Sequence, residues 1–235
     1  MIKYTLINRE ATKKVALALG SLNEQVVYVG GAVVSLYIND SAAADVRPTK
    51  DIDLTFQIAT TSKLGELRQD LNAKGFYQSS EEDVICRFLY EDLKVDVMST
   101  QSVGWAPSNP WFEKGFDKAI NVELDSLTIK ILPLPYFLAT KMEAFLNRGI
   151  DDVYGSHDLE DLVYLFNYTT DIDVQILASY QDIKLYLTEK LKYIMENHNI
   201  MSAFRANLDY HHADERMEII KESFQNIIDG FEQTQ

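Results

Sequence analysis

Two stretches of the sequence indicate the fold: Tyr28-Val29-Gly30-Gly31-Ala32 and Arg47-Pro48-Thr49-Lys50-Asp51-Ile52-Asp53-Leu54. The first stretch is a short apolar run that ends in two glycines. In the second, Asp51 and Asp53 are two residues apart in another apolar run, so on a strand they share a face, roughly 7 Å apart. Neighbouring carboxylates repel each other unless a cation lies between them. The second stretch therefore predicts a divalent metal site.

Gly30 and Gly31 predict a phosphate-binding turn between a strand and a helix. Backbone N–H groups at a helix N-terminus attract anions, and glycine lets a phosphate approach the backbone closely. A tight strand-to-helix turn without a ligand would use the same residues. The neighbouring carboxylates favour the binding interpretation, because Mg²⁺ shares its ligand shell with phosphate oxygens.

A third carboxylate, Asp96, alternates with apolar residues over 93–98 in the same way. A strand there would bring Asp96 beside Asp51 and Asp53. Three carboxylates around two divalent ions suit in-line phosphoryl or nucleotidyl transfer. A solvent-facing acidic stripe is the alternative, but Ile52 and Leu54 predict that the other face of the strand is buried.

The bulk composition is that of a globular protein, with 46% hydrophobic and 25% charged residues in a chain of 235. A net charge of −14 argues against a surface that coats nucleic acid or anionic lipid. The single Cys86 excludes an intramolecular disulfide and is predicted to fill the core. No signal-peptide core is found, and the longest apolar-rich run, 26–38, is shorter than the ~20 residues of a membrane span. A cytoplasmic protein is expected.

The pattern predicts an α+β fold with an N-terminal α/β domain at 1–132 and a helical domain at 133–235, divided near Pro133 and Pro135. Strands are predicted at 25–29, 51–58, 76–79, 84–90, 93–98, 119–123 and 127–131, with a tight hairpin at Glu91-Asp92. Helices are predicted at 8–19, 32–38, 62–73 with Ser62 as N-cap, 134–146, 159–168, 174–178, 183–197 and 213–231. Loops are predicted at 39–49 and 99–116.

Gly30-Gly31, Asp51-Ile52-Asp53 and Asp96 together resemble the signature of polymerase-β-type nucleotidyltransferases. The pattern is most similar to the minimal nucleotidyltransferases of the AbiEii abortive-infection toxin group, including MenT-like toxins. Lys141-Met142-Glu143-Ala144-Phe145-Leu146-Asn147-Arg148-Gly149 and His157-Asp158-Leu159-Glu160-Asp161-Leu162 are similar to that group's Lys…Arg…Asp-x-x-Asp-Leu helical segment. The resemblance spans residues 25–166 and implies a nucleotidyltransferase-like mixed sheet with flanking helices, followed by a C-terminal helical bundle.

The resemblance also implies an activity: transfer of NMP from an NTP to a hydroxyl, with two Mg²⁺ ions. The residues that it implies as metal ligands and catalytic groups are Asp51, Asp53 and Asp96. The nucleotide-binding residues predicted with it are Gly30, Gly31, Thr49, Lys141 and Asp158.

The sequence departs from the family pattern in two places. The nineteen residues between Gly31 and Asp51 form a long spacer, which places an insertion at 39–46. Gly-Gly stands where many relatives have Gly-Ser, so a hydroxyl for the phosphates is missing, and Thr49 is the candidate to replace it.

Lys141 also has a physical argument of its own. It lies between Phe137 and Phe145 at helical spacing, and a lysine in an apolar stripe is costly unless its head reaches water or an anion. The resemblance implies nucleotide phosphates as that anion, whereas snorkelling to the surface is the alternative. Arg148 on the same face is a candidate to assist. Asp158 has an alternative role as a helix N-cap.

The acceptor is the most open part of the prediction. The toxin relatives imply a tRNA 3′ end or a protein, in a toxin–antitoxin or phage-defence system with an antitoxin partner. The acidic net charge disfavours a large RNA. A small-molecule acceptor, as in antibiotic nucleotidyltransferases, is one alternative, and a nucleotide-binding or interaction module without catalysis is another.

Overall fold

The computed structural model describes residues 3–79 and 84–233. The chain divides into two units, residues 1–36 with 44–133 and residues 37–43 with 134–235. Residues 37–43 belong to the second unit, although the sequence pattern placed them in the N-terminal part. In that unit the N–H groups of Asn39 and Asp40 donate to the carbonyl of Tyr168.

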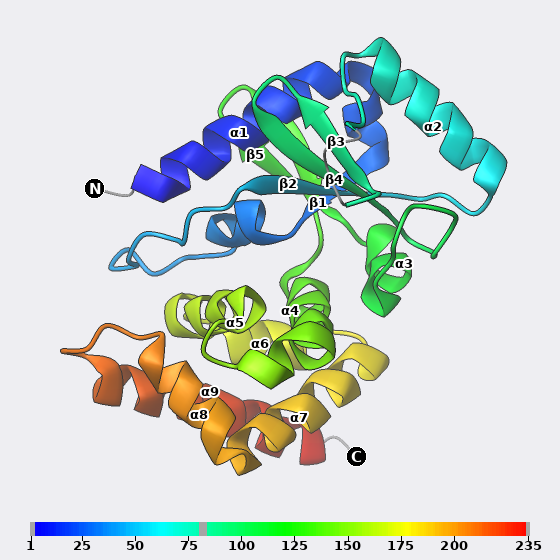
Figure 1. Cartoon of the computed structure of the whole chain (residues 1–235). Helices are drawn as coiled ribbons and strands as arrows, with labels where there is room; N and C mark the ends of the chain where they lie inside the picture. Colours follow the sequence, from blue (N-terminus) through cyan, green and yellow to red (C-terminus); the bar gives the residue numbers. More distant parts are fainter. Residues whose placement is uncertain (1–2, 80–83, 234–235) are drawn as a thin grey trace. The chain divides into compact units, whose positions relative to one another are not determined.

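A six-stranded sheet forms the centre of the first unit (Figure 1). Its strand order is β3-β4-β2-β1-β6-β5, and its strands are β1 (Val26–Val29), β2 (Asp51–Phe56), β3 (Arg87–Tyr90), β4 (Leu93–Ser99), β5 (Ile120–Leu124) and β6 (Leu127–Ile131). Strand β1 is antiparallel to β2 and parallel to β6, and β2 is parallel to β4. The β3–β4 and β5–β6 pairs are antiparallel. The sheet is therefore mixed, as predicted.

The central strands follow from their side chains. All four residues of β1 are buried, which suits the β-branched run in the middle of a sheet. On β2, Ile52 and Leu54 are buried while Asp51 and Asp53 are only partly buried. Strand β2 therefore buries one face and presents its carboxylates on the other.

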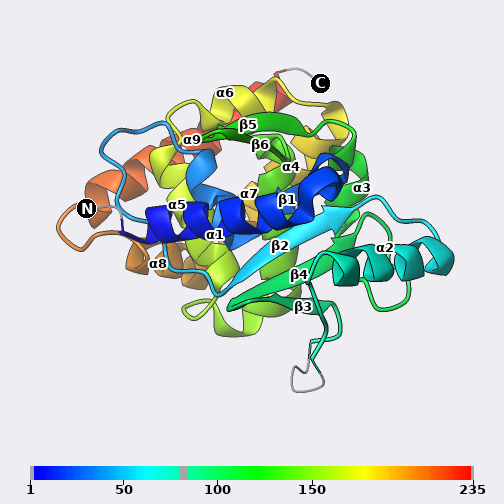
Figure 2. The ribbon, with the colours of Figure 1, turned by 90° about the horizontal axis from the view of Figure 1, so that it is seen from above.

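The helices of the first unit are α1 (Lys3–Leu19), α2 (Thr61–Ala73) and α3 (Pro110–Phe116), with the 3-10 helices η1 (Gly20–Gln25) and η2 (Gly31–Leu36). Figure 2 shows α1 crossing the sheet, where it contacts β2 and β6. The first turn of α1 is held by Asp45, whose carboxylate accepts the N–H groups of Tyr4 and Thr5 at 2.7 and 2.8 Å. One end of the predicted insertion is thereby fixed to α1.

Four local predictions for this unit are wrong. The helix expected at 32–38 is the short 3-10 helix η2, and the strand expected at 76–79 is reduced to one bridge, between Tyr77 and Leu89. Thr60 rather than Ser62 caps α2. Helix α3 lies in the predicted loop 99–116, where Asn109 caps it and proline takes its first position.

The second unit is helical. Its elements are α4 (Leu134–Ala144), the π-helical turn η3 (Phe145–Gly149), the 3-10 turn η4 (Ile150–Asp152), α5 (His157–Tyr168), α6 (Ile172–Leu177), α7 (Gln181–Glu196), α8 (His198–Ala206) and α9 (Ala213–Glu232). The residues of α4 from Leu134 to Met142 are all buried, so this helix is enclosed by its neighbours. Phe166 and Phe224 pack edge to face in the same core. Within the described ranges, no helix is long and apolar enough to span a membrane.

Helix α8 was missed by the sequence prediction. Asn197 is the C-cap of α7 and also the N-cap of α8, where its side chain accepts the N–H groups of Asn199 and Ile200. A single residue thus ends one helix and begins the next, so the sequence shows no gap of loop-like residues between them.

Candidate active site

The three predicted carboxylates lie on neighbouring strands of the first unit. Asp53 of β2 stands opposite Asp96 of β4 in the parallel register, and Asp51 lies two residues earlier on β2. Residues that are directly opposite each other on adjacent strands point to the same side of a sheet. The prediction that a neighbouring strand brings Asp96 beside the pair is confirmed.

The Gly30-Gly31 turn follows β1 directly and lies beside these carboxylates. Val29 pairs with Asp53, and Gly30 has a φ of +73°, a conformation that favours glycine. A Cβ on Gly30 would collide with the Asp53 carboxylate, and a Cβ on Gly31 would lie 2.5 Å from Arg47 Nη2. Both glycines therefore leave room for charged side chains at the turn.

Arg47 brings a positive charge to the glycine turn. The helix that follows the turn, η2, has six residues, so few peptide dipoles are aligned toward an anion. A guanidinium is a stronger anion donor, because its hydrogen bonds to phosphate are charge-assisted. Arg47 belongs to the stretch that precedes Asp51, but its position in the sequence alone indicated no role for it.

Thr49 contacts the first carboxylate. Its hydroxyl lies 3.1 Å from Asp51 Oδ1 and donates also toward the Asp51 carbonyl at 3.2 Å. These contacts orient Asp51. The predicted contact of Thr49 with a nucleotide stays a prediction.

Arg87 of β3 bridges two of the three carboxylates. Its Nε and Nη2 each lie 2.7 Å from an oxygen of Asp96, and Nη2 lies 3.1 Å from Asp51 Oδ2. The side chains of Arg87 and Asp96 are each 14% exposed, and that of Asp51 is 31% exposed. A guanidinium that binds both oxygens of one carboxylate makes a strong, geometrically specific pair.

The donors on this face suit magnesium in type, since three carboxylates supply the hard oxygen ligands that Mg²⁺ prefers. Among residues 3–79 and 84–233, however, no three Asp, Glu, His or Cys side chains converge to hold a metal ion. Asp51 and Asp96 both contact Arg87 Nη2, at 3.1 and 2.7 Å.

In the helical unit, Lys141 and Asp158 contact each other within a buried cluster. Lys141 Nζ lies 3.4 Å from Asp158 Oδ1 and 2.6 Å from Asp161 Oδ2, and the lysine side chain is 7% exposed. Lys141 therefore does not reach the surface, the alternative left open by the sequence, but is neutralised by carboxylates. Arg148 Nη2 lies 2.8 Å from Asp158 Oδ2, and the Arg148 side chain is 74% exposed.

Helix α5, which carries the two aspartates, is capped by Ser156, whose hydroxyl accepts the N–H of Leu159. Asp158 is thus a first-turn residue, and its predicted alternative as the N-cap is wrong. A Cβ on Gly149 would collide with Ser156 Oγ, so the small residue at the end of η3 lets the capped end of α5 pack closely.

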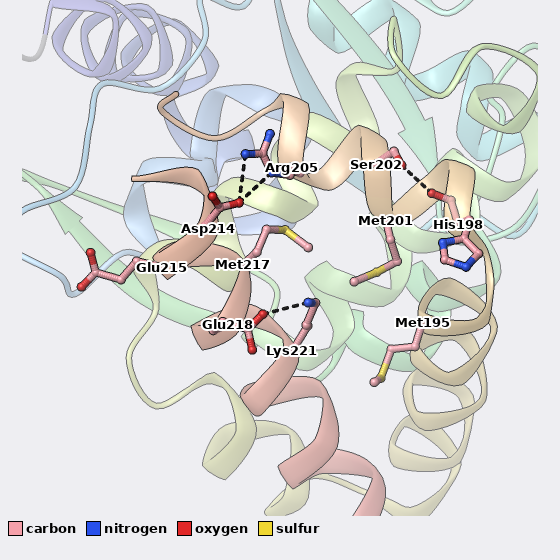
Figure 3. Close-up of a pocket in the computed structure, with 10 residues that line it drawn as sticks. All are labelled: Met195, His198, Met201, Ser202, Arg205, Asp214, Glu215, Met217, Glu218 and Lys221. Atoms are coloured by element: carbon pink, nitrogen blue, oxygen red, sulfur yellow. Dashed lines mark hydrogen bonds and ion pairs between the residues drawn. The ribbon is translucent and has the colours of Figure 1, made fainter. Parts of the chain in front are cut away.

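A hollow of about 700 Å³ lies in the helical unit between α7, α8 and α9 (Figure 3). Three methionines, Met195, Met201 and Met217, contribute to its lining. Four of its charged residues form two ion pairs, Arg205 with Asp214 at 2.9 Å and Lys221 with Glu218 at 2.8 Å. None of the residues predicted to act in catalysis or binding lines it.

Like Arg47, Arg87 has no role in the sequence prediction, although the predicted hairpin carried a signal for it. The hairpin predicted at Glu91-Asp92 pairs Tyr90 with Leu93, and the same register places Arg87 opposite Asp96. A predicted hairpin with a basic residue opposite a candidate catalytic carboxylate is therefore enough to indicate this ion pair.

Comparison with known proteins gives the class of the chain. Over residues 15–235 the sequence matches the family described as "Nucleotidyl transferase AbiEii toxin, Type IV TA system". The protein is a nucleotidyltransferase. It belongs to the AbiEii toxin family, as the sequence resemblance implied.

The chain was also compared with solved structures and with curated proteins. Among solved structures, the chain is similar to the crystal structure of an antigenic nucleotidyltransferase-like protein from Paracoccidioides brasiliensis, with 15% identity, a TM-score of 0.48, and coverage of 87% of this chain and 96% of that one. The search of curated proteins gave no significant match.

Proposed function

We propose that this nucleotidyltransferase is Mg²⁺-dependent, transfers NMP from an NTP to a hydroxyl acceptor with release of pyrophosphate, and acts as the toxin of a toxin–antitoxin or phage-defence system. The observation that carries the proposal is the register of Asp53 opposite Asp96 with Gly30 against the Asp53 carboxylate. It supports a site in which hard oxygen ligands and a glycine turn act together.

In this proposal the three carboxylates have different roles. Asp51 and Asp53 would hold the metal ions, and Asp96 would complete the acceptor side and accept the proton of the attacking hydroxyl. Magnesium, when bound, neutralises charge on the triphosphate and lowers the barrier to in-line displacement. Thr49 supports this arrangement because it orients Asp51.

The triphosphate side of the site is assigned to the glycine turn. Gly30 and Gly31 let phosphate oxygens approach the backbone, and Arg47 beside Gly31 provides a charged donor. Arg47 thereby compensates for the hydroxyl that the Gly-Gly sequence lacks.

Lys141 and Asp158 stay proposed nucleotide-binding residues on the strength of the resemblance. The ion pairs of Lys141 with two buried carboxylates also support a role in holding α4 and α5 together. Arg148, exposed beside Asp158, is the residue of this cluster that is open to an incoming phosphate.

For the acceptor we propose a tRNA 3′ end or a protein, with an antitoxin as partner and the cytoplasm as the place of action. The net charge of −14 favours the second candidate, a small cationic acceptor of the antibiotic type, because a large polyanion is repelled. The presence of all three carboxylates speaks against a module without catalysis.

The test offers each α-labelled NTP with Mg²⁺ to three acceptor pools: total tRNA, cell protein and an aminoglycoside. The matched variants are Asp53→Asn and Asp70→Asn, since Asp70 is an exposed aspartate on α2 of the same unit. We expect label in one pool with wild type and Asp70→Asn and none with Asp53→Asn. Equal labelling by Asp53→Asn, or no labelling with any NTP, would contradict the proposal, and labelling of the aminoglycoside alone would replace the tRNA or protein acceptor.

A further inference from the structure

Arg87 contacts oxygens of two carboxylates that we propose as metal ligands, Asp51 and Asp96. Nε and Nη2 engage both oxygens of Asp96, and Nη2 reaches Asp51 Oδ2 across β4. Two carboxylates on different strands are thereby joined by one guanidinium, in a position where they are at most 31% exposed.

The local structure fixes Arg87 in this place. Arg87 stands opposite Asp96 in the antiparallel register, and the next residue, Phe88, is fully buried and anchors the strand. The β3–β4 turn is also held, because Lys14 of α1 pairs with Glu91 at 2.7 Å and with Asp92 at 2.8 Å. The arginine therefore belongs to a built hairpin, and its position opposite Asp96 follows from the register.

A guanidinium at this position has two opposite effects. It relieves the repulsion among clustered carboxylates, which stabilises the fold when no metal is bound. It also repels an incoming divalent cation and occupies oxygens of two proposed ligands. Asp51 and Asp96, which we propose as metal ligands, are thus already neutralised by the guanidinium of Arg87.

We propose that Arg87 is a positioning residue that acts as the internal counter-ion of the metal site: it holds Asp51 and Asp96 in the metal-free protein and must release at least one of them when divalent metal binds. The inference rests on the proposed metal-dependent function of the same site. The observations behind it are the strand register that sets Asp53 opposite Asp96 and the ion pairs by which Arg87 binds both Asp51 and Asp96.

The test measures the binding of Mn²⁺ alone, without nucleotide, by electron paramagnetic resonance. The variants are Arg87→Gln, Arg87→Lys and, as a matched control on α1, Arg9→Gln. We expect Arg87→Gln to bind Mn²⁺ about tenfold more tightly than wild type, because a positive charge beside the ligands is gone. Arg87→Lys should fall between the two, since an ammonium cannot hold both oxygens of Asp96, and Arg9→Gln should match wild type.

Thermal unfolding provides the second readout. Without metal, Arg87→Gln should unfold at a lower temperature than Arg9→Gln, and Mn²⁺ should raise its Tm by more than it raises that of wild type. A folded Arg87→Gln that binds Mn²⁺ equally or more weakly would overturn the proposal. If Arg87→Gln does not fold, weaker or unchanged binding by Arg87→Lys would overturn it instead.

Neither readout requires turnover. Tighter Mn²⁺ binding by Arg87→Gln in a protein that transfers no nucleotide would support this inference and contradict the proposed function. If the wild type transfers nucleotide but Arg87→Gln binds Mn²⁺ no more tightly, the proposed function is supported and this inference is contradicted.

Discussion

Gly30 lies against the carboxylate of Asp53, so close that a Cβ would occupy the space of the carboxylate group. Because Gly30 also has a φ of +73°, two separate constraints require glycine here, one from the backbone and one from the site. This contact joins the end of β1 to the central carboxylate of β2, and it links the glycine turn to the metal chemistry that we propose.

Gly30→Ala should therefore lower nucleotidyl transfer by about 100-fold or more, because it displaces Asp53. It should also destabilise the protein by ~1–3 kcal/mol through backbone strain. Gly65→Ala is the matched control, since a Cβ at Gly65 on α2 meets no atom within 4 Å. It should stabilise the protein by ~0.5–1 kcal/mol and leave transfer unchanged. Urea unfolding and initial rates measure both effects; wild-type activity in Gly30→Ala would refute the link.

Lys141→Met should destabilise the protein by ~3–5 kcal/mol in the absence of nucleotide, because it leaves Asp161, only 3% exposed, without its charge partner at 2.6 Å. Lys192→Met, which breaks the exposed pair with Glu232, is the control and should change stability by less than ~1 kcal/mol. Thermal unfolding measures both. If Lys141→Met kept wild-type stability and lost only nucleotide affinity, the lysine would serve the nucleotide alone.

Asp45 should stabilise α1 in a pH-dependent manner. Burial raises the pKa of Asp45, but the N–H groups of Tyr4 and Thr5 outweigh it, and the pKa lies below its ordinary value of 3.8. The ionised form is thus the one that stabilises the folded state. Its contribution is present above the unfolded pKa and is lost as the pH falls through the lower, folded pKa.

Asp45→Ala should therefore lose ~1 kcal/mol of stability at pH 7, and the difference from wild type should shrink below about pH 4. Urea unfolding between pH 7 and pH 3.5 measures this, with Asp70→Ala as a control that shows no such trend. A difference that grew on acidification would have the wrong sign.

Cys86 should be nearly inert in the native protein. Burial, with Asp96 adding to it, raises the pKa of the thiol from 9.0 to about 11, so little reactive thiolate is present at pH 8. Alkylation by iodoacetamide should be about 100-fold slower in the native than in the unfolded protein. Asp96→Asn removes one cause of the shift and should speed the native reaction. Equal rates in native and unfolded protein would contradict this.

The central strands and the three-carboxylate row could be predicted from sequence because both depend on a period of two. Asp51 and Asp53 alternate with buried residues on β2, and Asp96 does so on β4. The hairpin at Glu91-Asp92 set the β3–β4 register correctly. Local alternation was enough for these features, since one face of each strand is buried.

What could not be predicted depends on partners that are distant in sequence or on turn chemistry. Residues 37–43 have no helix or strand period in their sequence, and contacts such as the bonds of Asn39 and Asp40 to Tyr168 reveal which unit they join. Helix α3 begins at Pro110 among residues that otherwise indicate a loop. The sequence shows that Lys141 lies in an apolar helical stripe. Its pairing with Asp161 could not be predicted, because it depends on how α5 packs against α4.

The position of the label distinguishes transfer of NMP from transfer of the terminal phosphate. The protein is incubated with Mg²⁺, the acceptor pool and the same NTP labelled either at the α- or at the γ-phosphate, with Asp53→Asn in parallel. We predict that α-label enters the acceptor and γ-label leaves as pyrophosphate with the wild type, and that neither happens with Asp53→Asn. Transfer of the γ-label to the acceptor, or equal transfer by Asp53→Asn, would contradict it.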